Sequence, residues 1–137
     1  MRTNRNKKVT MTLGKMVSMI PTLNYLCGNN GMIFPGKVSY ALYKNRIALV
    51  DDVDYYNKER ETIIDSCAEK NESGYVMTED GSGIVISDDK KQEFMDKMNE
   101  LDSQEIEVEF SMLSMDYFLD RDDMKPVYFE TLEMMCE

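Results

Sequence analysis

The sequence predicts an α+β fold, with a long helical hairpin, a small antiparallel β-sheet and short C-terminal helices. Three observations support this prediction. Residues 37–71 contain no glycine or proline and repeat apolar side chains at steps of three, four and seven, which is typical of an amphipathic helix. Residues 105–110 alternate strictly between glutamate and apolar side chains, as a half-buried strand does. Pro126 stands where a final helix would begin, because proline is favoured in the first helical turn.

The chain is predicted to form one domain preceded by a tail. Its 137 residues are enough to bury a single core, and no low-complexity linker divides them. Residues 1–11 are polar and basic, so we expect a flexible tail there, with a short edge strand over residues 8–13 as the alternative. Residues 12–137 then make up a single α+β domain.

Two helices are expected to form the hairpin. The first covers residues 13–27 and contains Pro21, which either kinks the helix or starts a second piece. The second, over residues 37–71, would be roughly 50 Å long if unbroken. Such a helix has to bend, break or pack on a second chain, and its heptad-like stripe suits a hairpin with the first helix or a dimer. The candidate self-association residues on this stripe are Leu49, Val53, Tyr56 and Ile63.

The second half of the chain is expected to alternate between short strands and helices. Residues 75–87 are predicted as a β-hairpin that turns at Asp80 and Gly81. Residues 89–101 follow as a short helix, and residues 105–110 as a strand with its glutamates toward solvent. The apolar positions on the buried sides of this helix and strand are Phe94, Met98, Leu101, Ile106, Val108 and Phe110.

Charge is distributed unevenly along the chain. Residues 1–50 carry eight basic and no acidic side chains, whereas residues 51–137 carry eight basic and 26 acidic ones, so the net charges are +8 and −18. The two parts can neutralise each other in part on folding, but a net charge of −10 remains. A negative face repels nucleic acid and attracts basic protein surfaces. The candidate residues for such a face are Glu105, Glu107, Glu109, Asp120, Asp122 and Asp123.

One short segment has the outline of a phosphate-binding loop. Residues 31–39, GMIFPGKVS, approach the pattern G-x-x-x-x-G-K-[ST], and IALVDD, an apolar run ending in two aspartates, follows soon after. However, Val38 stands where the magnesium-binding hydroxyl is needed, and Pro35 has no N–H to offer a phosphate. We therefore interpret the segment as an apolar connection between two helices, in which residues 32–34 cap the core or contact a partner.

The composition argues against catalysis and against a bound metal. The chain has no histidine, so it lacks the commonest general base and metal ligand. The segment EDGSG at residues 79–83 lacks the upstream carboxylates of a calcium loop, and the cysteines have no C-x-x-C spacing. We expect no enzyme activity, no cofactor and no metal.

The composition also favours a cytoplasmic protein. No stretch approaches 18 consecutive apolar residues, and the basic N-terminal segment lacks the apolar region of a secretion signal. The three cysteines are odd in number and far apart, which favours free thiols in a reducing compartment. Thirteen methionines either fill the core or line an adaptable binding surface, for which MVSMI at residues 16–20 and SMLSMDYF at residues 111–118 are candidates.

The order of these parts resembles small acidic accessory proteins encoded by phages and prophages of Gram-positive bacteria. The resemblance rests on TLGKMVSMIPTLNYL, ERETIIDSCAEKNESG, the turn DGSG and KKQEFMDKMNELDSQEIEVEF, and it covers most of residues 12–135. It implies a virus-encoded protein. Many such proteins bind host machinery, some block CRISPR or other defence complexes by occupying basic nucleic-acid channels, and others assist virion assembly.

These observations lead to two main hypotheses about function. The first is a non-enzymatic inhibitor or adaptor, in the cytoplasm of the host bacterium, whose acidic surface docks on a basic, nucleic-acid-binding host complex. The second is a structural or assembly protein that self-associates through its long helix, as a homodimer for example. A third possibility is a nucleotide- or nucleic-acid-binding module that uses the basic residues of the first fifty positions.

Overall fold

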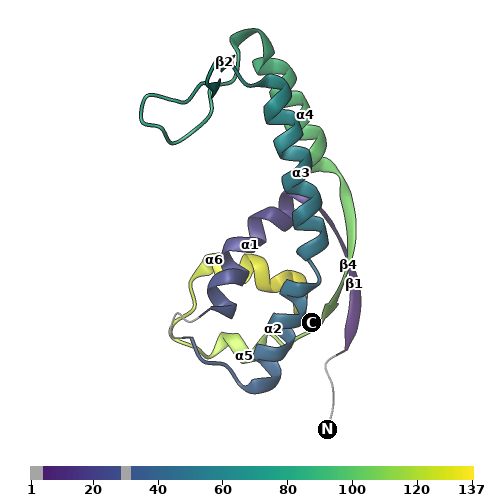
Figure 1. Cartoon of the computed structure of the whole chain (residues 1–137). Helices are drawn as coiled ribbons and strands as arrows, with labels where there is room; N and C mark the ends of the chain where they lie inside the picture. Colours follow the sequence, from purple (N-terminus) through teal and green to yellow (C-terminus); the bar gives the residue numbers. More distant parts are fainter. Residues whose placement is uncertain (1–4, 29–31) are drawn as a thin grey trace.

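The two ends of the chain build a body, and its middle forms a two-helix arm that projects from the body (Figure 1). The computed structural model describes residues 5–28 and 32–137. The body contains β1 (Asn6–Thr12), α1 (Leu13–Cys27), α2 (Gly36–Ile47), β4 (Glu105–Ser111), α5 (Asp116–Leu119), α6 (Pro126–Leu132) and η2 (Glu133–Met135). The arm contains α3 (Val50–Cys67), β2 (Lys70–Asn71), β3 (Gly74–Tyr75), η1 (Asp88–Lys90) and α4 (Lys91–Ser103). These elements confirm the predicted α+β fold with a small antiparallel sheet and short C-terminal helices.

Strand β1 pairs with β4 in an antiparallel sheet along one side of the body. Val9 lies opposite Val108 and Met11 lies opposite Ile106, and these four side chains are buried or partly buried. The flexible tail predicted for residues 1–11 is therefore wrong for residues 6–11, where the alternative, a short edge strand expected over residues 8–13, forms as β1. Residues 1–4 of the predicted tail lie outside the described residues.

Helix α1 begins at a capping threonine and continues through its proline. The Thr12 hydroxyl accepts a hydrogen bond from the Lys15 N–H at 3.1 Å, as the side chains of N-cap residues do. Pro21 lies inside a single helix, so the second helical piece considered from the sequence does not form. The buried residues of α1 recur at steps of three and four and are Leu13, Met16, Met19, Thr22, Leu23 and Leu26.

The long helix predicted over residues 37–71 is divided into α2 and α3 by a bend at Ala48 and Leu49. Both residues keep right-handed helical backbone angles, and the Val53 N–H still donates to the Leu49 carbonyl at 2.9 Å. Leu49 is fully buried, so the bend keeps the apolar stripe against the body. Beyond the bend, α3 packs mainly on α4. The arm is therefore a hairpin of α3 with α4, whereas the sequence pattern indicated the first helix as the partner.

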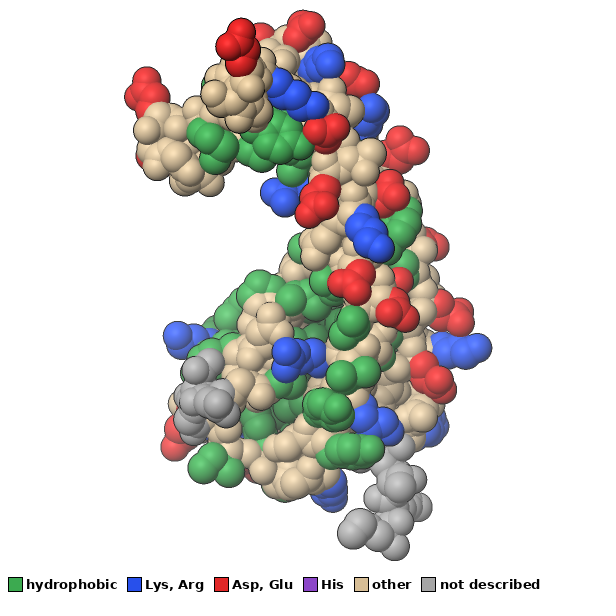
Figure 2. Space-filling model, viewed as in Figure 1, with side chains coloured by type: hydrophobic (Ala, Val, Ile, Leu, Met, Phe, Trp, Pro, Cys, Tyr) green, Lys and Arg blue, Asp and Glu red, His purple; other side chains and the backbone are tan. Residues whose placement is uncertain are grey.

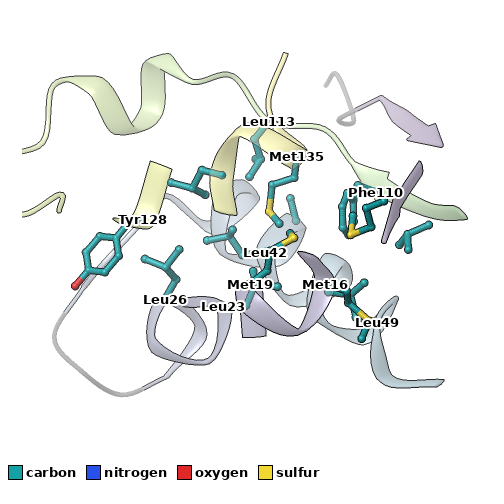
Figure 3. Packing of buried hydrophobic residues seen from close by; sticks show 14 of the residues in the cluster. Met16, Met19, Leu23, Leu26, Leu42, Leu49, Phe110, Leu113, Tyr128 and Met135 are labelled. Atoms are coloured by element: carbon teal, nitrogen blue, oxygen red, sulfur yellow. The ribbon is translucent and has the colours of Figure 1, made fainter. Parts of the chain in front are cut away.

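Methionines and leucines from several elements fill the core of the body (Figure 3). Met16 and Met19 of α1, Leu42 of α2 and Met135 of η2 are each at most 1% exposed. Unbranched methionine side chains fit the irregular gaps between helices that cross at different angles. The segment MVSMI therefore fills the core, and the interpretation of this segment as an adaptable binding surface is wrong.

A buried asparagine joins α2 to the end of β4. The Asn45 side chain is 1% exposed, accepts a hydrogen bond from the Ser111 N–H at 2.7 Å and donates one to the Ser111 carbonyl at 3.0 Å. The same side-chain amide lies 3.5 Å from the Met135 sulfur. Buried backbone groups need hydrogen-bond partners. Asn45 supplies an acceptor for the Ser111 N–H and a donor for the Ser111 carbonyl, the two partners that the backbone of a neighbouring strand would otherwise provide.

Two glycines in the first turns of helices are predicted to respond differently to alanine. A Cβ at Gly14 would lie 3.1 Å from the Asp102 Cβ and 3.2 Å from the Asp102 carbonyl oxygen, where α1 meets the end of α4. At Gly36, nothing lies within 4 Å. We expect Gly36→Ala to raise the free energy of unfolding by roughly 0.5–1 kcal/mol, because alanine reduces the entropy of the unfolded chain. We expect no increase from Gly14→Ala, and equal stabilisation of both variants in urea unfolding would contradict this close approach.

Candidate functional site: an acidic arm

The arm carries the whole net charge of the protein. Residues 50–104 contain sixteen acidic and six basic side chains, a net charge of −10, whereas the rest of the chain contains ten of each kind. Fourteen of the sixteen acidic side chains are exposed. Figure 2 shows acidic side chains along the arm from its base to its tip. The acidity of the chain is therefore concentrated on the part that projects.

Half of the basic side chains on the arm are held by neighbouring carboxylates. The ion pairs, with their N–O distances, are Lys70–Asp65 (2.9 Å), Lys91–Asp88 (2.8 Å) and Lys97–Glu93 (3.0 Å). Exposed pairs of this kind contribute little to stability. The Tyr75 hydroxyl also donates to Asp65 at 2.7 Å, and this bond, followed by the bond from Lys70, lowers the pKa of the Asp65 carboxyl.

Aspartates crowd the base of the arm. Asp51 and Asp52 lie in the first turn of α3, where the helix dipole favours negative charge, and Asp54 follows. Partial burial, together with the charge of Asp51, raises the pKa of Asp52. The negative charges of Asp51 and Asp52 therefore lie close together where the arm joins the body.

The tip of the arm contains the turn predicted at Asp80 and Gly81. Gly81 has a φ of 71°, in the left-handed region that glycine adopts readily. Isolated antiparallel bridges join Met77 to Ile84 and Ala68 to Ile86. The predicted hairpin over residues 75–87 thus turns at the expected place, but single bridges replace continuous strands.

Asp80 organises this turn through its carboxylate. It accepts hydrogen bonds from the Thr78 hydroxyl at 2.7 Å and from the Ser82 hydroxyl and N–H at 2.7 and 3.1 Å. These bonds, that from Thr78 first, lower the pKa of the Asp80 carboxyl to about 2. Because the folded-state pKa is lowered, the ionised Asp80 carboxylate stabilises the fold. This stabilisation is complete above the unfolded pKa of about 3.9 and is lost as the pH falls through about 2. The tip therefore keeps this negative charge throughout the physiological range.

An apolar hollow of about 540 Å³ lies beneath the tip loop, between the loop, α3 and α4. Figure 2 shows apolar side chains beneath the loop, with acidic and basic side chains on the surrounding surface. Met77 at its edge is 49% exposed, and methionine suits surfaces that adapt to a partner. The main lining residues are Arg60, Ile64, Met77, Ile84, Ile86 and Phe94.

The three glutamates predicted as binding residues on the strand are exposed on the outer face of β4. Glu105, Glu107 and Glu109 alternate with Ile106 and the buried Val108, as the sequence pattern predicts. Strand β1 sets Lys8 opposite Glu109 and brings its Nζ to 3.6 Å from a Glu107 carboxylate oxygen. This cation offsets part of the charge of the strand. Glu105 adjoins the arm, because β4 begins two residues after α4 ends.

The other predicted acidic residues lie on a different side of the body. Asp120 and Asp122 are exposed beside the turn after α5, across the body from β4 (Figure 1). Asp123 forms two hydrogen bonds with Arg121, at 2.9 and 2.7 Å, and the bond from Arg121 lowers the pKa of the Asp123 carboxyl. The pair directs Arg121 to the Ile33 carbonyl, which it reaches at 2.7 Å. The structure therefore does not unite the six predicted residues in one acidic face.

The predicted self-association stripe is covered within the single chain. Leu49 is fully buried, Tyr56 and Ile63 are 8% and 9% exposed, and Val53 is partly buried against the same core. The Tyr56 hydroxyl donates to an Asp102 carboxylate oxygen of α4 at 2.9 Å. The stripe holds α3 to the rest of the chain, and its use for contact with a second copy is wrong.

The cysteine thiols and clusters of possible metal ligands are the other candidate functional groups. Cys27, Cys67 and Cys136 form no disulfide, and burial raises the pKa of the Cys136 thiol to about 11. Within residues 5–28 and 32–137, no three acidic or cysteine side chains come together as a metal site. None of the helices in the described part of the chain has both the length and the apolar character that crossing a membrane requires.

The arm therefore offers a projecting, negatively charged surface with an apolar hollow near its end. Exposed carboxylates bind cationic groups, and a hollow of this kind accepts an apolar side chain. In the comparison with known proteins, no family model, no curated protein and no solved structure matches the chain.

Proposed function

We propose that this chain is a non-enzymatic binding protein whose acidic arm docks on a basic surface of a partner protein. The observation that carries the proposal is the location of the net charge of −10 on residues 50–104, which project from a neutral body. Complementary charge speeds the encounter of two proteins and selects between partners. The apolar hollow at the tip supplies what exposed charges lack, a recess that an apolar side chain of the partner would fill and so shield from water.

We further infer that the partner is a nucleic-acid-binding protein or complex. Surfaces that bind nucleic acid are rich in lysine and arginine, because phosphates attract these side chains. The arm presents carboxylates along two antiparallel helices in a narrow projection, which suits a groove or channel built for a phosphate backbone. An arm seated there would exclude the nucleic acid. This is the inhibitor or adaptor role, of the anti-CRISPR or another anti-defence type, that the resemblance to phage accessory proteins implies.

A pull-down from a nuclease-treated lysate of a Gram-positive bacterium tests the proposal. One bait is the native sequence, and the other carries Glu61→Gln, Glu72→Gln and Glu79→Gln on the arm. We expect the native bait to retain a basic nucleic-acid-binding protein that is released as the salt rises from about 0.05 to about 0.5 M, because salt screens exposed charges. The arm variant should retain much less of it. Equal recovery with both baits at every salt concentration would contradict the proposal.

A further inference from the structure

A row of exposed apolar side chains follows the outer face of the bent helix. Tyr40, Tyr43 and Ile47 of α2 and Val50 of α3 are 62%, 53%, 54% and 46% exposed. Their spacing of three, four and three residues places them on one helical face. Figure 2 shows apolar side chains in a row over α2 and the start of α3. Contiguous exposed apolar side chains mark interaction surfaces, and this row is separate from the buried stripe on the opposite face.

The charges beside the row change sign at its middle. On α2, Lys37, Lys44 and Arg46 are exposed, and this helix contains no acidic residue. On α3, Asp51 and Asp54 are exposed at the other end of the row. The row thus has a basic half, before Ile47, and an acidic half, after it.

A hollow of about 330 Å³ adjoins the row. Tyr43 and Ile47 contribute to its lining, together with Lys44, Ala48 and the end of β4. It offers space for an apolar side chain that approaches the outer face of α2. The row therefore combines protruding side chains with a recess beside them.

We propose that this row is a homodimer interface, in which a second copy of the chain packs antiparallel about a two-fold axis at Ile47. In this arrangement, residues three or four positions before Ile47 face residues three or four positions after it. Lys44 of each copy then faces Asp51 of the other, and Tyr43 faces Val50. A parallel arrangement would instead set like charges against each other. Only the antiparallel pairing lets one surface be complementary to itself, as a two-fold interface requires.

The proposed dimer leaves both acidic arms available. Because the helices run in opposite directions, α3 of each copy points away from α3 of the other. The dimer would present two acidic arms to its partners. The two surfaces are tested by different substitutions, because the arm variants Glu61→Gln, Glu72→Gln and Glu79→Gln change no residue of the row.

Sedimentation velocity from about 1 to about 200 µM tests the interface, since a small apolar patch is expected to give micromolar association. We expect the native chain to shift from monomer to dimer within this range. Ile47→Asp should weaken the dimer by at least about tenfold, because it places a charge on the axis. Leu119→Asp, at a 60% exposed position on α5, is the matched control and should leave the dimer unchanged. Circular dichroism checks that both variants fold. A native chain that stays monomeric, or a dimer that survives Ile47→Asp, would overturn the proposal.

A charge exchange tests the antiparallel arrangement. Lys44→Glu and Asp51→Lys, made singly, should each weaken the dimer by about three- to tenfold, because each sets like charges against each other. The double variant restores opposite charges across the axis and should associate within about twofold of the native chain. If the double variant is as weak as the single ones, the two copies do not pack antiparallel in this register.

Discussion

Asn45→Ala is expected to lower the free energy of unfolding by roughly 3 kcal/mol. The substitution removes two hydrogen bonds, at 2.7 and 3.0 Å, from a side chain that is 1% exposed. The N–H and carbonyl of Ser111 then remain buried without these partners, and each unpaired group costs about 1–3 kcal/mol. Alanine also leaves a space beside Met135. Urea unfolding followed by circular dichroism measures the effect.

The control for this variant is Asn57→Ala on α3. Asn57 is exposed on the same bent helix, so its replacement tests the loss of a helical asparagine without the loss of buried bonds. We expect a change within about 0.5 kcal/mol, as for most surface substitutions. If Asn45→Ala costs less than about 1 kcal/mol, the bonds to Ser111 do not hold α2 to the sheet.

Phe118→Ala is expected to cost about 3–5 kcal/mol, the usual range for a fully buried phenylalanine. Phe118 is fully buried and meets the Phe34 ring edge to face, with the ring centroids 5.6 Å apart. The Arg121 guanidinium lies 4.5 Å from the centroid of Phe34. Phe118 therefore packs against Phe34 and holds the described part of the connection between α1 and α2 to the core.

Leu119→Ala is the matched control for this prediction. It lies on the same four-residue helix but is 60% exposed, so its loss should change the free energy of unfolding by no more than about 0.5 kcal/mol. Similar losses in the two variants would show that the short helix α5, rather than the aromatic contact, sets the stability.

In the connection between α1 and α2, the local sequence does not predict which apolar residue is buried. From the sequence, residues 32–34 either cap the core or contact a partner. Phe34 is 8% exposed and caps the core, whereas Ile33 is 82% exposed. Gly31, at the start of the P-loop-like segment, lies outside the described residues. Periodicity alone does not show which of Ile33 and Phe34 is buried, because the burial of Phe34 depends on its aromatic contact with the distant Phe118.

The elements that the sequence predicts correctly are those with a local period. The stripe over residues 37–71 is buried at Val38, Leu42, Tyr56 and Cys67, and the alternation of β4 is observed. These patterns reflect one buried face of each element, so they do not depend on what covers that face. For the same reason, the stripe alone does not show whether a second copy or other helices of the same chain cover it. In the structure, α1 and α4 cover it.

Features that depend on distant parts of the chain were not predictable in this way. β1 forms because its backbone pairs with β4, about a hundred positions later. Asn45 has no sequence signal, because its partner is the backbone of Ser111. From the sequence, the acidic surface is expected at the alternating glutamates of β4 and at Asp120, Asp122 and Asp123. Its location on the arm depends on the bounds of residues 50–104, which the fold defines by separating α3, the tip loop and α4 from the body.

The most direct test of the central claim compares two triple variants that remove the same charge. One carries Glu61→Gln, Glu72→Gln and Glu79→Gln on the arm, and the other carries Glu105→Gln, Glu107→Gln and Glu109→Gln on β4. The affinity of each for the partner captured by the native chain is measured at several salt concentrations. We expect the arm variant to bind about tenfold more weakly with a smaller salt dependence, and the strand variant to bind within about twofold of the native chain. Weaker binding by the strand variant, with the arm variant unaffected, would contradict the assignment of the binding surface to the arm.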